Sequence, residues 1–86
     1  MLKIELKPIG SNMNELHIGD NVILFSYSTP VAALVPGEGC LKTEIFHSDT
    51  TSRHISKWLD GIEAKKVPQE YIESLLIIRP DPDWAV

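Results

Sequence analysis

Residues 21–35, which read NVILFSYSTPVAALV, are the most strongly β-type stretch of this chain and decide its fold class. The run VILFSY at residues 22–27 is rich in β-branched and aromatic residues, which predicts a central strand. Pro30 has no backbone N–H to donate to a neighbouring strand, so it predicts a bend or a bulge. Residues 31–35 resume the strand with Ala32 and Ala33, whose small side chains would let a helix approach the sheet closely.

Shorter β-type segments lie on both sides of this run. Apolar and charged residues alternate over residues 2–7, which is the period of a half-buried strand with one wet face. Residues 8–12 then predict a turn or loop, residues 15–18 a short strand, and residues 40–46 a strand after the turn at residues 36–39. Because sequential strands usually pair, we expect an antiparallel meander.

Two helices are expected after the strands. The first is predicted by TTSRHISKWL at residues 50–59, where Thr50 or Thr51 would be the N-cap and Gly61 the stop. Its buried stripe has the helical spacing i, i+3, i+4 and i+7 and comprises Ile55, Trp58, Leu59 and Ile62. The second helix is expected to begin near Pro68, with a buried side made of Tyr71, Ile72, Leu75 and Leu76.

These elements predict an α+β fold with a four- or five-stranded, mostly antiparallel sheet followed by two helices packed on one face. A chain of 86 residues is expected to form one domain, which we place at residues 1–78. Residues 79–86, RPDPDWAV, are expected to form an extended acidic C-terminal tail. Asp81, Asp83 and Trp84 make this tail a candidate interaction segment.

The composition narrows the function classes. The net charge of −4 disfavours general binding to a phosphate backbone, although a local basic patch stays open. No run approaches the ~20 apolar residues of a membrane helix, so no membrane partner is expected. The single cysteine and the lack of a signal-peptide pattern at the start predict a cytoplasmic location.

No residue pattern indicates an enzyme, a metal site or a cofactor. Cys40, His47, Asp49 and His54 lack the tight pairs that zinc sites usually show. His54 is the one residue that invites a catalytic or pH-sensitive role. The structural alternative, which we favour, is that its ring packs at the helix start and bonds a backbone carbonyl or the Tyr27 hydroxyl.

A basic cluster offers a second candidate surface. Its members on the first helix and the following linker are Arg53, Lys57, Lys65 and Lys66. They are candidate phosphate contacts, and with an aromatic ring nearby they would suit a single strand of nucleic acid. The alternative, which we favour, is a solvated face balanced by nearby carboxylates.

The segments FSYSTPVA at residues 25–32 and TTSRHISKWL at residues 50–59 resemble a family of small domains of unknown function in bacteriophage, plasmid and other mobile-element proteins. The resemblance covers the middle of the chain and leaves out residues 1–13 and 77–86. It implies a fold and a genetic neighbourhood but no reaction, so it gives no catalytic role to Tyr27, Thr29, Thr51 or His54. Glu38 stands in a turn after which the family often has Lys or Arg, which weighs against a nucleic-acid role by analogy.

We therefore expect a small non-enzymatic protein-interaction module from a phage or mobile element. Its partner would be a host or viral protein, and inhibition of a host defence system is one concrete form of that role. The alternative is a nucleic-acid-binding accessory protein that uses the basic cluster. A homodimer also stays open, because residues 22–27 or the first strand could present an edge to a second copy.

Overall fold

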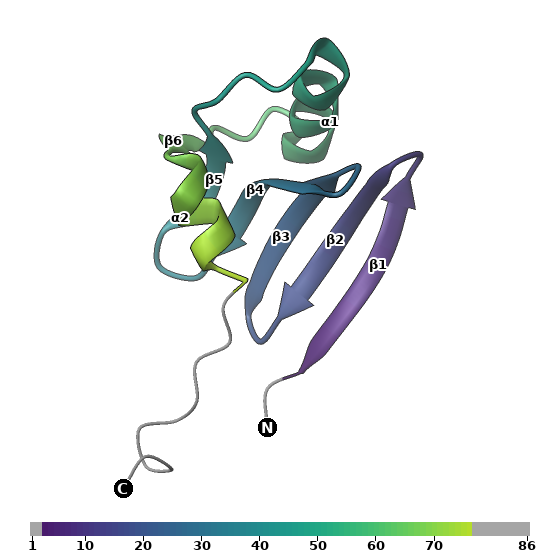
Figure 1. Ribbon diagram of the computed structural model, residues 1–86. Helices are drawn as coiled ribbons and strands as arrows, with labels where there is room; N and C mark the ends of the chain where they lie inside the picture. The colour runs from purple at the N-terminus through teal and green to yellow at the C-terminus, as the bar shows by residue number, and fades with distance from the viewer. Residues whose placement is uncertain (1–2, 77–86) are drawn as a thin grey trace, which may run out of the picture.

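The computed structural model describes residues 3–76, whose strands form one six-stranded sheet (Figure 1). The elements follow one another as β1 (Ile4–Gly10), β2 (Met13–Ile18), β3 (Asn21–Ser26), β4 (Thr29–Val35), β5 (Gly39–Thr43), α1 (Asp49–Leu59), β6 (Lys65–Val67) and α2 (Gln69–Ser74). Strands β1 to β5 form the expected antiparallel meander in sequential order. Strand β6 pairs with β5 in parallel, because α1 carries the chain back between them. The α+β class is confirmed, and the sheet has more strands than the four or five expected.

The two helices lie on opposite faces of the sheet, so the prediction that both pack on one face is wrong. Successive residues of a strand point to opposite faces. Leu24 of β3 belongs to the cluster that Ile55 and Trp58 of α1 cover, whereas Ile23 beside it belongs to the cluster that Ile72 of α2 completes. We call these two surfaces the α1 face and the α2 face.

Strand β4 separates the two clusters at the centre of the sheet. Ala32 faces α1 and Ala33 faces α2, and both are fully buried. Pro30 lies where the register between β3 and β4 shifts, because Leu24 pairs with Ala32 while Phe25 pairs with Pro30. The predicted bulge is confirmed at this point.

Several local expectations are corrected. Pro8 belongs to β1 and does not begin a loop. Strand β5 ends at Thr43 and not at residue 46. The Glu44 N–H still donates to the Val67 carbonyl of β6, and the chain then turns towards α1. Ile62 lies beyond the end of α1 and is 60% exposed, so it does not belong to the buried stripe.

The N-cap of α1 is Ser48 rather than Thr50 or Thr51. The Ser48 hydroxyl accepts from the Thr51 N–H at 3.1 Å, which satisfies one of the free donors of the first turn. Helix α1 ends at Leu59, followed by Asp60 and Gly61 with positive φ, so the predicted stop near Gly61 is confirmed. Neither described helix is long and apolar enough to cross a membrane.

Helix α2 begins after Pro68, close to where the sequence predicts it, and Ile72 on its buried side is completely covered. The Tyr71 hydroxyl donates to both carboxylate oxygens of Glu38, at 2.6 and 2.7 Å. This hydrogen bond, together with desolvation and the nearby negative charge, raises the pKa of Tyr71 above its ordinary value of 10.0. It fastens α2 to the turn between β4 and β5.

Candidate functional site

Strand β1 is an edge strand whose described residues are all exposed. Ile4 is 52% exposed and Leu6 is 62% exposed, although both point to the α2 face beside the half-buried Leu16 and Phe25. The expectation that one side of this strand would be buried is therefore wrong. Helix α2 contacts β4 and β5 and stops short of β1, so nothing among residues 3–76 covers this side.

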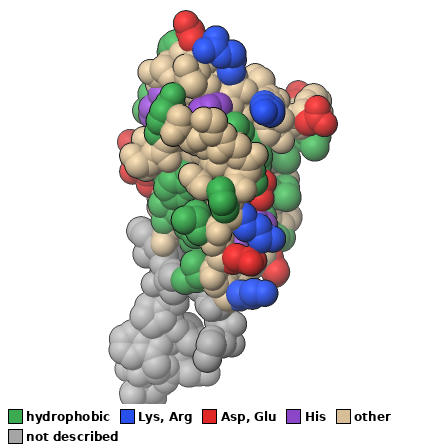
Figure 2. Space-filling model, turned by 90° about the vertical axis from the view of Figure 1, so that its right-hand side faces the viewer, with side chains coloured by type: hydrophobic (Ala, Val, Ile, Leu, Met, Phe, Trp, Pro, Cys, Tyr) green, Lys and Arg blue, Asp and Glu red, His purple; other side chains and the backbone are tan. Residues whose placement is uncertain are grey.

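A shallow groove of about 340 Å³ follows this uncovered side, lined by Leu6, Asn14, Leu16, Phe25, Tyr27 and Ser28. Figure 2 views the molecule from the β1 side and shows hydrophobic side chains gathered there, with charged ones beside them. We define the β1 surface as Ile4, Leu6, Leu16, Phe25 and the free backbone edge of β1.

The backbone edge of β1 has a definite pattern of free groups. The Lys3 carbonyl accepts from the Gly19 N–H at 2.8 Å, so the backbone groups of Lys3 point towards β2. Because these groups alternate along an antiparallel strand, those of Ile4, Leu6 and Pro8 point outwards. The backbone nitrogen of Pro8 therefore faces away from β2, so its lack of a hydrogen costs no bond within the sheet. Edge strands tolerate proline at such positions.

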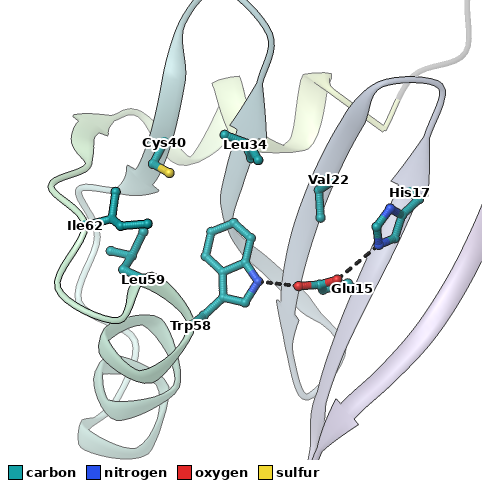
Figure 3. A pocket seen from close by; sticks show the side chains of 8 residues that line it. All are labelled: Glu15, His17, Val22, Leu34, Cys40, Trp58, Leu59 and Ile62. Carbon is teal, nitrogen blue, oxygen red and sulfur yellow. Dashed lines mark hydrogen bonds and ion pairs between the residues drawn. The ribbon is translucent and has the colours of Figure 1, made fainter.

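A second groove, of about 260 Å³, lies on the α1 face (Figure 3). Its floor is a row of neighbours across four strands, in which His17, Val22, Leu34 and Cys40 pair in sequence. Trp58 and Leu59 of α1 and the exposed Ile62 form its other wall. The groove is mainly apolar, with one polar corner.

Glu15 organises that polar corner. One of its carboxylate oxygens accepts from the Trp58 indole N–H at 2.7 Å, and the other lies 3.0 Å from His17 Nε2. Neighbouring strands lie about 4.8 Å apart, so Cys40 and His17, three strands apart, are separated by about 14 Å. They therefore cannot act together as a thiol and its base.

His54 lies in a buried chain of hydroxyl groups where α1 meets β3. Its Nδ1 is 2.7 Å from the Ser26 hydroxyl, which lies 3.0 Å from the Thr51 hydroxyl, and Ser48 donates to Thr51 at 3.2 Å. The ring also packs against Tyr27, with 5.8 Å between the ring centroids. The hydrogen-bond partner of the ring is thus Ser26, in place of the expected backbone carbonyl or Tyr27 hydroxyl.

The predicted basic cluster does not form one surface. Arg53 and Lys57 lie on the exposed side of α1, whereas Lys65 and Lys66 are neighbours on β6 and therefore point to opposite faces. Lys66 lies instead beside Lys42 of β5, next to a groove that includes the exposed Phe46.

Other candidates are not assembled into a site by the described residues. Asp81, Asp83 and Trp84 lie outside residues 3–76. Within that range, no three His, Cys, Asp or Glu side chains gather closely enough to hold a metal ion, so Cys40, His47, Asp49 and His54 do not form such a group.

The sequence offered the first strand as one possible edge for a second copy, but the uncovered apolar side of the β1 surface was not expected. Its signal was the alternation of residues 2–7, which identifies the strand but not whether a helix covers it. The groove on the α1 face was missed as well, because its floor joins residues from four strands.

The fold and these surfaces define a small α+β domain with one helix on each face of a mixed sheet and an exposed edge strand, β1. A protein-family model described as a family of unknown function (DUF8033) matches residues 4–74, from the first residue of β1 to the last residue of α2. The chain belongs to this family, which confirms the expectation of a small domain of unknown function. No curated protein and no solved structure matches the chain.

Proposed function

We propose that this chain is a non-enzymatic protein-interaction module that binds its partner through the β1 surface. The observation that carries the proposal is the exposure of Ile4 and Leu6 on a strand whose outer backbone edge pairs with no other strand among residues 3–76. Natural proteins usually protect such an edge by covering, twisting or shortening it. Pro8 and the irregularity after it protect only the end of β1, so residues 4–7 stay open beside apolar side chains.

The kind of contact follows from the geometry. An extended segment of a partner can add to β1 through main-chain hydrogen bonds to Ile4 and Leu6, while its alternate side chains fill the apolar groove. Exposed apolar patches next to polar rims are typical of protein interfaces. The partner strand would be apolar on the α2 side and polar on the α1 side.

A non-enzymatic role agrees with the chemistry of the polar groups. The Ser26 hydroxyl next to His54 belongs to a residue that is 2% exposed, so a substrate has no access to it. The proposal expects His54→Ala to lower stability and to leave partner binding intact in the folded fraction.

Matched surface variants test the proposal. Leu6 is 62% exposed on the β1 surface, and Ile62 is 60% exposed in the groove of the α1 face, so their exposures match. We expect Leu6→Glu to abolish capture of a protein partner from nuclease-treated lysate, and Ile62→Glu to retain it. Retention in Leu6→Glu with loss in Ile62→Glu would indicate that the interface lies on the α1 face.

The resemblance to mobile-element domains supports a more specific form of the proposal, in which a phage or mobile element encodes the chain and its partner belongs to a host defence system. Co-expression with a bacterial defence system tests this form. We expect protection of an incoming phage by the wild-type chain and none by Leu6→Glu. Equal phage restriction with and without the wild-type chain would show that the chain does not inhibit the defence system tested.

Nucleic-acid binding is the second candidate, and one observation favours it. Lys42 and Lys66 are direct neighbours across β5 and β6, beside Phe46, which is 64% exposed. Basic groups next to an aromatic ring are a common arrangement for binding single strands. This role predicts affinity that falls steeply with salt and is lost in Lys42→Glu with Lys66→Glu. Glu44 in the same groove and the net charge of −4 oppose it.

A further inference from the structure

The geometry points to a second copy of this chain as the occupant of the β1 edge, paired antiparallel in a register centred on Leu6. The inference rests on the proposed function, because it names the partner of the same β1 surface. A twofold axis normal to the sheet would join the two sheets and keep their α2 faces on one side.

The backbone groups of β1 fit this register. Those of Ile4, Leu6 and Pro8 point outwards, as the contact between Lys3 and Gly19 establishes. The two copies of Leu6 would exchange N–H···O bonds, and each Ile4 N–H would face the Pro8 carbonyl of the other copy. Because Pro8 has no N–H, the Ile4 carbonyl of the other copy receives no hydrogen bond from it. That carbonyl would be hydrated instead.

The charges of β1 are self-complementary in the same register. Glu5 and Lys7 point to the α1 face, where their side chains form an exposed ion pair of 3.6 Å within one chain. Centring the pairing on Leu6 sets Glu5 of each copy directly opposite Lys7 of the other. Opposite charges at directly facing positions stabilise a strand pair, and like charges destabilise it.

Neighbouring registers lack this match. Centring on Glu5 places Glu5 against its own copy and Lys3 against Lys7, and centring on Lys7 sets Lys7 against its own copy. Centring on Ile4 would match Lys3 with Glu5 but would leave Pro8 and the following residues of β1 without a facing strand. Of these registers, only the one centred on Leu6 combines facing opposite charges with a long overlap between the two β1 strands.

The same arrangement buries apolar side chains of β1. On the α2 face, Leu6 would lie beside Leu6 of the other copy, and Ile4 beside Pro8. These side chains are the exposed ones of β1, with 62% of Leu6 and 52% of Ile4 accessible in the single chain. The pairing therefore covers apolar surface that the fold itself leaves in water.

Sedimentation equilibrium of the full chain, over a range of concentrations, tests the inference with charge variants. We expect a wild-type dimer, and a rise of about ten-fold or more in the dimer Kd for Glu5→Lys and for Lys7→Glu, because each variant sets like charges opposite one another. The double variant Glu5→Lys with Lys7→Glu restores opposite charges and should restore the dimer. Mixing the two single variants should form a heterodimer, because one then carries only Lys and the other only Glu at these positions.

The outcomes separate this inference from the proposed function. A wild-type chain that stays monomeric at all concentrations, or charge variants that dimerise as tightly as the wild type, would overturn the pairing. If such a monomer still loses a captured partner in Leu6→Glu, the β1 surface binds a different protein and only the second-copy inference fails. Circular dichroism of each variant confirms that the change lies in association and not in folding.

Discussion

The indole N–H of Trp58 donates to the Glu15 carboxylate at 2.7 Å and so joins α1 to β2, two elements that lie far apart in the sequence (Figure 3). The same carboxylate holds His17 at 3.0 Å on its other oxygen. Since α1 otherwise packs mainly over β3, this bond fixes where the helix lies along the α1 face.

Removing the indole N–H should therefore loosen α1. We expect Trp58→Phe, which keeps an aromatic ring, to lower the free energy of unfolding by about 1–2 kcal/mol, because the lost bond is made to a charged acceptor. Urea unfolding followed by circular dichroism measures this change. Glu15→Gln keeps an acceptor oxygen and should cost less, so an equal or larger loss in Glu15→Gln would contradict the assigned role of the bond.

The N-cap of α1 can be tested by a pair of alanine variants. Ser48→Ala should lower the free energy of unfolding by about 1 kcal/mol, because the Thr51 N–H loses its acceptor. Thr50→Ala is the control and should change it by less than about 0.5 kcal/mol, because its hydroxyl makes only an exposed contact with Arg53. Thermal or urea unfolding of both proteins decides which residue caps the helix.

The buried hydroxyl chain predicts a larger effect. Ser26→Ala removes a partner from both Thr51 and His54 and should cost about 1–3 kcal/mol, because buried polar groups lose a hydrogen bond. Ser56→Ala on the exposed side of α1 is the control and should stay within about 0.5 kcal/mol of the wild type. Equal stability of the two variants would show that the chain contributes nothing.

The contact between Tyr71 and Glu38 predicts a pH dependence in alkali. Its hydrogen bond raises the pKa of Tyr71 above 10.0, so the unfolded chain loses this proton before the folded one does. The contribution to stability is therefore complete below pH 10.0 and is lost as the pH rises through the folded pKa. Ultraviolet titration should show a tyrosine that ionises above pH 10.0 in the wild type, and this late step should be absent in Tyr71→Phe.

The strands could be predicted because their signals are local. The β-branched run at residues 22–27 and the proline at position 30 depend on backbone preferences that the fold preserves. Strand β6 could not be predicted, because Lys65, Lys66 and Val67 carry no period and become a strand only by pairing with β5. The N-cap was missed because Ser48 stands in a run of residues that can all cap a helix.

The face that each helix covers is a tertiary property. The apolar stripes of residues 55–59 and 71–76 show that each helix has a buried side, yet they carry no information on which side of the sheet receives it. Ala32 and Ala33 are both small, so either face admits a helix. The exposure of Ile4 and Leu6 on β1 could not be predicted for the same reason, because apolar alternation suits a covered strand as well as an open one.

Amide hydrogen exchange, followed residue by residue by NMR, tests the β1 surface most directly. The outward N–H groups of Ile4 and Leu6 should exchange rapidly in the dilute single chain. They should become protected in the bound state, whether a partner or a second copy is bound. Unchanged exchange at Ile4 and Leu6, with protection gained around Ile62 on the α1 face, would contradict the account.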